Sequence, residues 1–274
     1  MKFCISADNR VRVYLKMITK LGQSINKKFS DVKYLIGYFG KLIRASFVFA
    51  RQKASRKILI MQLLFTFVEA LPICGILAAG IGSAIVLLGS SVLVELGQGK
   101  LTYDILVLII TRELGPVLIA FIVTARSVTA IATEISSMVV DHEIEAYISV
   151  GVDPIKHLAA PRFIGVTLSL VLLNIYFSIF GLIAPAFLVQ FISTLSIKDY
   201  FDALFKALSV KVILISIIKS FVFGMLISGA ATLYGFNAGR ASTEIPIAGL
   251  RAVGKAFVFI FIADLFISVL SYMV

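Results

Sequence analysis

The sequence contains no tryptophan and has few charged residues for its length. Asp, Glu, Lys and Arg make up 15% of its 274 residues, whereas a soluble domain carries roughly 25%. The stretches 70–94 and 163–197 contain none of them. A membrane-spanning helix needs about 20 apolar residues, because a helix rises about 1.5 Å per residue and the hydrocarbon core is about 30 Å thick. The chain is therefore predicted to be an all-α integral membrane protein, with tyrosine and basic residues as its interfacial anchors.

Cysteine is also scarce. The two present, Cys4 and Cys74, lie in a basic segment and in a predicted membrane span, so we expect no structural disulfide between them. A cleavable signal peptide is not predicted either, because the first residues run straight into polar and basic ones. An internal span is then expected to direct membrane insertion.

Sequence motifs for nucleotide binding and catalysis are absent. There is no Gly-x-x-x-x-Gly-Lys-Ser/Thr loop, so the chain is not expected to bind ATP by a P-loop. It also lacks a Gly-x-Ser-x-Gly elbow and the paired aspartates of a lipid transferase. His142, Glu143, Glu145 and His157 carry metal-binding groups, but their spacing fits neither a His-Glu-x-x-His helix nor a Cys/His cluster. We therefore predict no catalytic residue, no metal and no cofactor bound by this chain.

Basic residues are concentrated near the N-terminus. The net charge is +11, and residues 1–57 hold 14 of the 26 Lys and Arg residues. Apolar residues recur there at three- and four-residue spacing, a pattern typical of helices that lie in the membrane plane. Such a segment could bind nucleic acid or anionic lipid headgroups, and the span that follows at once favours the lipid surface. The positive-inside rule then places the N-terminus in the cytoplasm.

Five membrane spans are predicted from the apolar runs. They cover residues near 58–88, 105–139, 163–192, 212–236 and 252–273. Small residues crowd the first span, where they allow close helix packing, dimerisation or a lipid-sized groove, with packing as the default interpretation. A cytoplasmic N-terminus places two connections outside, 95–104 and 198–211, and two inside, 141–162 and 237–251. The basic residues of these connections balance, so the orientation depends on the basic N-terminal segment.

Charged residues within the spans are the clearest candidates for function, because each is costly in lipid unless it is paired or hydrated. Arg112 and Glu113 lie directly before Leu114-Gly115-Pro116, about 12 Å along the helix from Asp104. Proline bends a helix and leaves one carbonyl unpaired. The Arg–Glu pair therefore either lines a polar pocket between helices or fixes the helix register, and both interpretations stay open.

Four more charges within the spans are candidates for function. Arg126 and Glu134 follow along the same stretch and are candidates for structural or gating charges. Lys219 and Asp264 lie in the fourth and fifth spans. They are expected to pair or to face a cavity, unless Lys219 extends its amine to the membrane surface.

The most polar internal segment predicts a short helix over about 141–150, between two spans. Three of its side chains share one face: Ile144, Tyr147 and Ile148. Gly151 is placed to end the helix in the left-handed conformation. Asp153-Pro154 is typical of the N-cap and first residue of the next helix. Such an element is either a connector or a docking element for a cytosolic partner.

Several motifs match one known family. They are Arg112-Glu-Leu-Gly-Pro116, Arg126, Glu134, Met138, Glu143-x-Glu145-Ala, Gly151-Val-Asp-Pro154 and Pro161-Arg162-Phe163. With them the chain resembles the MlaE/YrbE permeases, the membrane subunits of ABC transporters associated with MCE-domain proteins. The sequence departs from the family pattern at Ser90, Thr124–Val128 and Tyr147–Ser149, which leaves the substrate preference open.

The resemblance implies a homodimer in the bacterial inner (cytoplasmic) membrane that moves phospholipid, as in the system that maintains outer-membrane lipid asymmetry. It implies a cytosolic ABC ATPase, which would bind ATP and Mg, and an MCE-domain protein in the periplasm. Helix 141–150 would be the coupling helix that contacts the ATPase. The matching positions for substrate binding are Ala79, Val86, Leu87, Arg112 and Glu113. Those for ATPase coupling are Glu143, Ile144, Tyr147, Ile148 and Asp153.

Two other functional classes are weighed against transport. One is a membrane scaffold that anchors MCE and ATPase proteins without moving lipid. The other is an intramembrane lipid-modifying enzyme, which the missing catalytic residues disfavour. Charges beside a broken helix favour a transporter over the scaffold.

Overall fold

The computed structural model of the chain describes residues 33–51, 55–95, 101–192 and 197–273. All regular structure in these ranges is helical, which confirms the all-α prediction. By its internal packing the chain divides into two units, residues 1–44 and residues 45–274. In the first unit, residues 33–44 are described and are helical. Most of the predicted interfacial segment 1–57 lies outside the described residues, so its amphipathic helices stay a prediction.

Five helical stretches in the described part of the second unit are long and apolar enough to span a membrane, as predicted. They are Leu59–Leu93, Leu101–Val140, Ile155–Phe187, Val210–Phe236 and Glu244–Met273. The second, third and fifth begin four to eight residues before their predicted starts. The reason is that each helix includes polar residues before its apolar run, whereas the predicted starts are set by the first residue of that run.

The first span consists of two helices joined by a tight turn. They are α2 (Ser55–Phe67) and α3 (Leu71–Glu95), and the 3-10 turn η1 (Val68–Ala70) lies between them. Pro72 stands in the first turn of α3, where its missing N–H costs no intrahelical hydrogen bond. A Cβ added to Gly82 would clash with the carbonyl oxygen of Gly181. Small residues of this span therefore let α3 pack closely against the third span.

The second span changes its helical geometry twice. It runs through α4 (Leu101–Val107), the π-helical turn η2 (Leu108–Leu114), α5 (Gly115–Val123), a second π-helical turn η3 (Thr124–Val128) and α6 (Thr129–Val140). The break predicted at Gly115-Pro116 takes the form of the first π turn. Pro116 has no N–H, and its ring crowds the carbonyl four residues earlier, so the preceding turn widens. No proline marks the second π turn, and the sequence does not predict it.

α10 (Val210–Phe236) packs against α6 and against the helices of the third and fifth spans, α8 (Ala160–Ile192) and α11 (Glu244–Met273). A Cβ added to Gly224 would lie 2.6 Å from the Cα of Thr167 on α8. Three buried hydroxyls of α10 donate to carbonyls four residues earlier, those of Ser220, Ser228 and Thr232. These three hydroxyls are therefore satisfied by the backbone of their own helix.

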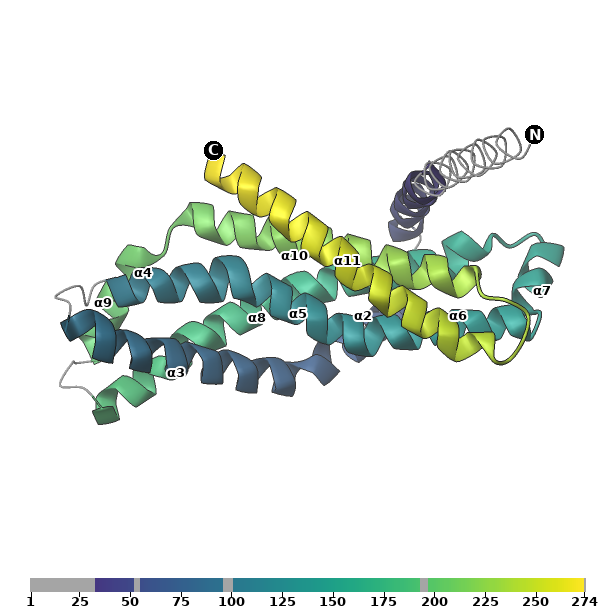
Figure 1. Cartoon of the computed structure of the whole chain (residues 1–274). Helices are drawn as coiled ribbons and strands as arrows, with labels where there is room; N and C mark the ends of the chain where they lie inside the picture. Colours follow the sequence, from purple (N-terminus) through teal and green to yellow (C-terminus); the bar gives the residue numbers. More distant parts are fainter. Residues whose placement is uncertain (1–32, 52–54, 96–100, 193–196, 274) are drawn as a thin grey trace, which may run out of the picture. The chain divides into compact units, whose positions relative to one another are not determined.

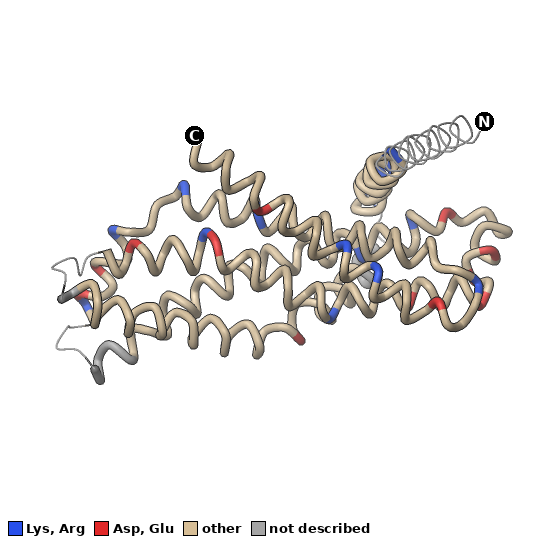
Figure 2. The backbone as a smooth tube through the Cα atoms, viewed as in Figure 1, with Lys and Arg blue, Asp and Glu red and all other residues tan. Residues whose placement is uncertain are grey.

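The connections between spans lie at two ends of the unit (Figure 1). One end holds α9 (Ile197–Ala207) and the start of α4, and the other holds α7 (Glu143–Ser149), the π-helical turn η4 (Ile155–Ala159) and the connection between α10 and α11. Charged residues gather toward these ends, with fewer in the length between them (Figure 2). Successive connections therefore lie at opposite ends of the unit, as expected for a chain that crosses the membrane five times. Which end faces the cytoplasm stays a prediction.

Tyr200 anchors α9 to its end of the bundle. Its side chain is fully buried, and its hydroxyl donates to the carbonyl oxygen of Leu182 at 2.7 Å. The ring meets that of Tyr103 edge-on, with 5.5 Å between centroids. Burial raises the pKa of Tyr200, and the neighbouring Tyr103 adds to the rise, so the phenol stays protonated and keeps donating.

Left-handed residues bracket α7 at the opposite end. Gly151 follows the helix with a φ of 77°, as predicted. Asp153 Oδ1 accepts a hydrogen bond from the backbone N–H of Ile155 at 3.0 Å, which confirms the predicted N-cap. His142 precedes α7 with a φ of 60°, a conformation uncommon for any residue with a side chain, and the sequence does not predict it.

Candidate functional site

Four charged side chains meet between the second, fourth and fifth spans. Lys219 of α10 is completely buried, and its Nζ lies 2.5 Å from Glu113 Oε2 and 2.9 Å from Asp264 Oδ1. It also donates to the hydroxyl of Ser268 at 2.8 Å. Glu113 comes from η2, whereas Asp264 and Ser268 come from α11. Lys219 therefore pairs inside the protein and does not extend to the membrane surface.

Arg112 completes this group, which we call the ion network: Arg112, Glu113, Lys219 and Asp264. The Arg112 Nη2 donates to the hydroxyl of Ser271 at 2.7 Å, and its Nε lies 3.2 Å from Glu113 Oε1. The guanidinium carbon lies 4.2 Å from the ring centre of Tyr272, a cation–π distance. Two cations and two carboxylates leave the ion network with no net charge.

Burial explains why this balance matters. Arg112 is only 8% exposed and Lys219 is not exposed at all. A buried ion is tolerated where partners replace its lost water, and removing one partner strands the other. The contacts are those of a network that fixes the register of three helices, one of the two interpretations open from sequence. A polar pocket at Arg112 stays a prediction.

A second ion pair links the first two spans. Arg126 of η3 donates from Nη2 to the Glu69 carboxylate Oε2 at 2.7 Å, and from Nη1 to the Glu69 carbonyl oxygen at 2.6 Å. The side chains are 40% and 47% exposed, so this pair differs from the ion network in burial. Sequence reasoning missed Glu69. The rule applied to the other spans, that a charge within a span is a functional candidate, would have found it.

Glu134 belongs to a third pair. Its Oε1 lies 2.6 Å from Nη2 of Arg162 on α8, and Arg162 also donates to the carbonyl oxygen of Leu158 at 2.8 Å. Arg162 is buried, whereas half of the Glu134 side chain is exposed. The pair joins α6 to the start of α8, close to the α7 end of the bundle.

The substrate-binding positions predicted on α3 do not form one surface within a single chain. Val86 is buried in the core, its neighbour Leu87 is 39% exposed, and Ala79 is half-buried. Val86 therefore packs inside the protein, while Leu87 faces outward. A ligand that touches all three would need α3 to shift or a second molecule to complete the surface.

Four of the five predicted coupling residues lie within α7, and Asp153 follows it. Glu145 Oε1 lies 2.8 Å from Nη2 of Arg240, and its Oε2 lies 3.0 Å from Nδ1 of His142. Arg240 belongs to the connection between α10 and α11, so Glu145 ties α7 to the base of the fifth span. Ile148 is 60% exposed at the tip of the helix.

The other predicted coupling residues frame this tip. Glu143 is exposed, whereas Ile144 is half-buried. Tyr147 is also half-buried, with its ring centroid 5.6 Å from that of His157. Asp153 Oδ2 lies 3.8 Å from Nζ of Lys156. The helix thus presents an apolar tip beside acidic groups.

Comparison with known proteins gives one family and several relatives. The family model described as "Permease MlaE" matches residues 59–270, which include nearly all of the five spans. A probable ABC transporter permease protein of Rickettsia prowazekii is 26% identical over 94% of this chain and 100% of its own length. The chloroplastic protein TRIGALACTOSYLDIACYLGLYCEROL 1 of Arabidopsis thaliana is 29% identical over 76% of this chain and 60% of its own. A probable ABC transporter permease protein of Synechocystis is 24% identical over 74% and 78%.

Proposed function

The chain belongs to the MlaE permease family, and we propose that it moves phospholipid between the bacterial inner membrane and an MCE-domain protein, driven by a separate ABC ATPase. As a family member it is a multi-pass membrane permease. The observation that carries the proposal is the ion network, buried where three spans meet. Its charges are satisfied in one arrangement and would be stranded if those spans moved apart without a new partner.

A phosphate group is the ligand that suits Arg112. A guanidinium binds phosphate through paired, charge-assisted hydrogen bonds. In the structure Arg112 contacts Glu113, its neighbour on η2, and Ser271 of α11, so movement of the fifth span would take Ser271 away from it. We propose that a lipid phosphate replaces Glu113 on Arg112 while Glu113 stays on Lys219, so that no charge is left alone.

The acyl chains are proposed to lie along the first span, near the axis of a homodimer. Within one chain, only 22% of the most apolar segment of the first span is buried, and only 11% of the corresponding segment of the fifth span. Both spans therefore offer surface to lipid or to a second copy of the chain. Ala79, Val86 and Leu87 are the proposed contacts. The name of the Arabidopsis relative contains trigalactosyldiacylglycerol, a lipid, which supports lipid as the class of cargo.

The α7 end is proposed to face the cytoplasm and to receive the ATPase, which would bind ATP and Mg. The exposed Ile148 suits an apolar pocket on the partner, and Glu143 and Asp153 would contact the partner beside it. The half-buried Ile144 and Tyr147 would hold the helix against the rest of the chain. Movement of α7 would reach α11 through the Glu145–Arg240 contact.

The test is lipid transfer by the complex of this chain with its ATPase and MCE proteins in liposomes. Arg112→Ala is expected to lower transfer of a labelled phospholipid by about tenfold or more, because a charged hydrogen bond to the phosphate is lost. Ser271→Ala is the matched control, since it removes a neutral partner of Arg112 and keeps the cation. Transfer at the wild-type rate by Arg112→Ala would refute the role of Arg112. A wild-type complex that assembles, hydrolyses ATP and moves no lipid would favour the scaffold.

A further inference from the structure

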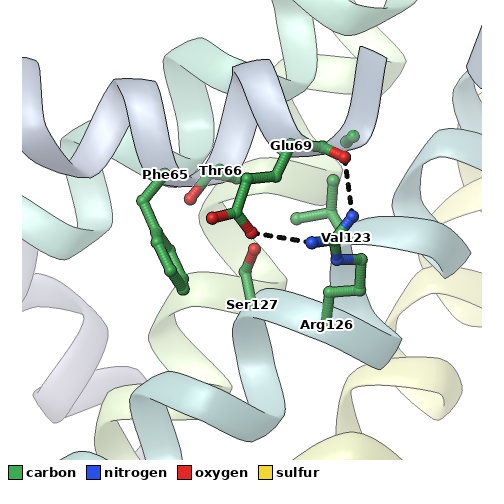
Figure 3. Close-up of a pocket in the computed structure, with 7 residues that line it drawn as sticks. Phe65, Thr66, Glu69, Val123, Arg126 and Ser127 are labelled. Carbon is green, nitrogen blue, oxygen red and sulfur yellow. Dashed lines mark hydrogen bonds and ion pairs between the residues drawn. The ribbon is translucent and has the colours of Figure 1, made fainter. Parts of the chain in front are cut away.

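A polar hollow opens between the first and second spans, away from the ion network. It has a volume of about 230 Å³. It is lined by Phe65, Thr66, Glu69, Ala70, Val123, Arg126 and Ser127. Glu69 and Arg126 lie side by side in it, with the ring of Phe65 to one side of the Glu69 carboxylate (Figure 3). They are the only charged residues of this lining, so the hollow holds one charge of each sign.

The depth of the hollow is set by the lengths of its helices. Arg126 lies 22 residues beyond the exposed Asp104, which is about 33 Å along a helix. Glu69 lies 24 residues before Leu93, the end of the first span, or about 36 Å. Both distances are close to the thickness of the hydrocarbon core, about 30 Å. If Asp104 and Leu93 mark one boundary of the hydrocarbon core, the two charges lie at the opposite boundary with the headgroups, on the side of α7.

The backbone departs from α-helical geometry on both sides of the hollow. Glu69 is the middle residue of the 3-10 turn Val68–Ala70, and Arg126 is the middle residue of the π turn Thr124–Val128. Unlike the first π turn of this span, which precedes Pro116, the turn that holds Arg126 has no proline beside it. Isolated π turns of this kind occur frequently at functional sites.

The ion pair in the hollow can exchange partners at little cost. Both side chains are nearly half exposed, and such pairs add little to stability because water competes for each ion. A ligand with one anionic and one cationic group could open the pair and satisfy both ions again. An anionic ligand would bring its charge against the Glu69 carboxylate, and a cationic one would meet Arg126. The hollow therefore favours a zwitterion.

We propose that this hollow binds the headgroup of a zwitterionic phospholipid from the leaflet on the α7 side, with the phosphate on Arg126 and the ammonium on Glu69. Phe65, which is 51% exposed, lies beside the pair where the glycerol end of the lipid would leave the hollow. The site is distinct from the ion network and rests on the proposed function only in taking lipid as the ligand. The two charges of the hollow identify the bound lipid as a zwitterionic phospholipid, for example one with an ethanolamine headgroup.

The test compares lipid binding by the complete complex in detergent, measured by native mass spectrometry. The probes are diheptanoyl phosphatidylethanolamine, diheptanoyl phosphatidylglycerol and the chain-free compound phosphoethanolamine. Wild type is expected to retain the ethanolamine lipid about fivefold more than the glycerol lipid, the ratio that about 1 kcal/mol provides. Glu69→Gln should abolish this preference, because the carboxylate that repels the anionic lipid is gone. Arg126→Gln should weaken binding of both lipids.

Arg251→Gln serves as the matched control, because Arg251 forms a half-exposed ion pair with Glu244 on α11 outside the hollow. It should leave the lipid preference unchanged. An unchanged preference in Glu69→Gln, or equal retention of the two lipids by wild type, would overturn the assignment. If phosphoethanolamine competes as well as the full lipid, the hollow binds a free zwitterion and the lipid assignment is wrong.

The outcome is separable from that of the proposed function. Transport by a Glu69→Gln complex that keeps the wild-type preference would end the hollow's role and leave the permease role standing. A preference that depends on Glu69 in a complex that moves no lipid would do the reverse.

Discussion

The molecule holds its intramembrane charges in two different ways. The ion network buries Arg112 and Lys219 among three spans and balances them with two carboxylates. The pair Glu69–Arg126 joins only two spans and leaves both side chains nearly half exposed. Coulomb attraction is strong where water is excluded and weak where it is not. The first arrangement is therefore suited to hold helices in register, and the second to exchange its partners.

Loss of the central cation is expected to have the largest effect. Lys219→Met should lower the free energy of unfolding by about 3–5 kcal/mol, because it leaves Asp264 without its cation in a buried setting. Unfolding of the purified protein in mixed micelles with increasing denaturant would measure this. Lys255→Met is the control, since Lys255 is an exposed cation on α11 and its loss should change stability by less than about 0.5 kcal/mol.

A second substitution distinguishes charge balance from lost packing. Lys219→Met combined with Asp264→Asn restores a neutral network, with Arg112 still facing Glu113. The double variant is expected to regain at least about 1 kcal/mol over Lys219→Met alone, because neighbouring charges couple. Equal stability of the single and double variants would show that Lys219 contributes by its volume and not by its charge.

The exposed pair should behave differently under the same measurement. Arg126→Gln is expected to lower the free energy of unfolding by less than about 1 kcal/mol, since a solvent-accessible ion pair contributes little. Raising the salt concentration should shrink that difference further, as screening acts on accessible charges first. A loss as large as that of Lys219→Met would mean that the hollow is closed to water in the folded membrane protein, and the proposed exchange with a headgroup would fail.

Much of this architecture follows from the sequence, because the length of an apolar run along one helix determines whether that helix can span the bilayer. Apolar length fixes the five spans, and Gly151 and Asp153 mark the end of one helix and the start of the next through strictly local geometry. The break at Pro116 is local as well, since the missing N–H acts on its own helix. These features need no knowledge of tertiary contacts.

What the sequence does not predict depends on contacts between helices. Lys219 and Glu113 are 106 residues apart, and no local pattern states that they meet. Glu69 is a charge within a span like the others, but its partner on η3 appears only when the two spans pack. The second π turn has no proline to mark it. Register between helices is set by packing, which one sequence does not reveal.

The smallest change in the free energy of unfolding is expected at the α7 end. A substitution there should lower lipid transfer while it leaves stability almost unchanged. Arg240 is 74% exposed and binds Glu145 at 2.8 Å, so Arg240→Ala should change the free energy of unfolding by less than about 0.5 kcal/mol. If this contact carries movement from α7 to α11, the variant complex should keep its ATPase partner bound while lipid transfer per ATP hydrolysed falls.

Ile148→Asp is the complementary change, because it places a charge on the exposed apolar tip and should release the partner itself. Measuring partner retention and transfer per ATP for both variants separates docking from transmission. An Arg240→Ala complex that transfers lipid with full efficiency would show that α11 receives its movement by another route, through the helix packing of α6 and α10.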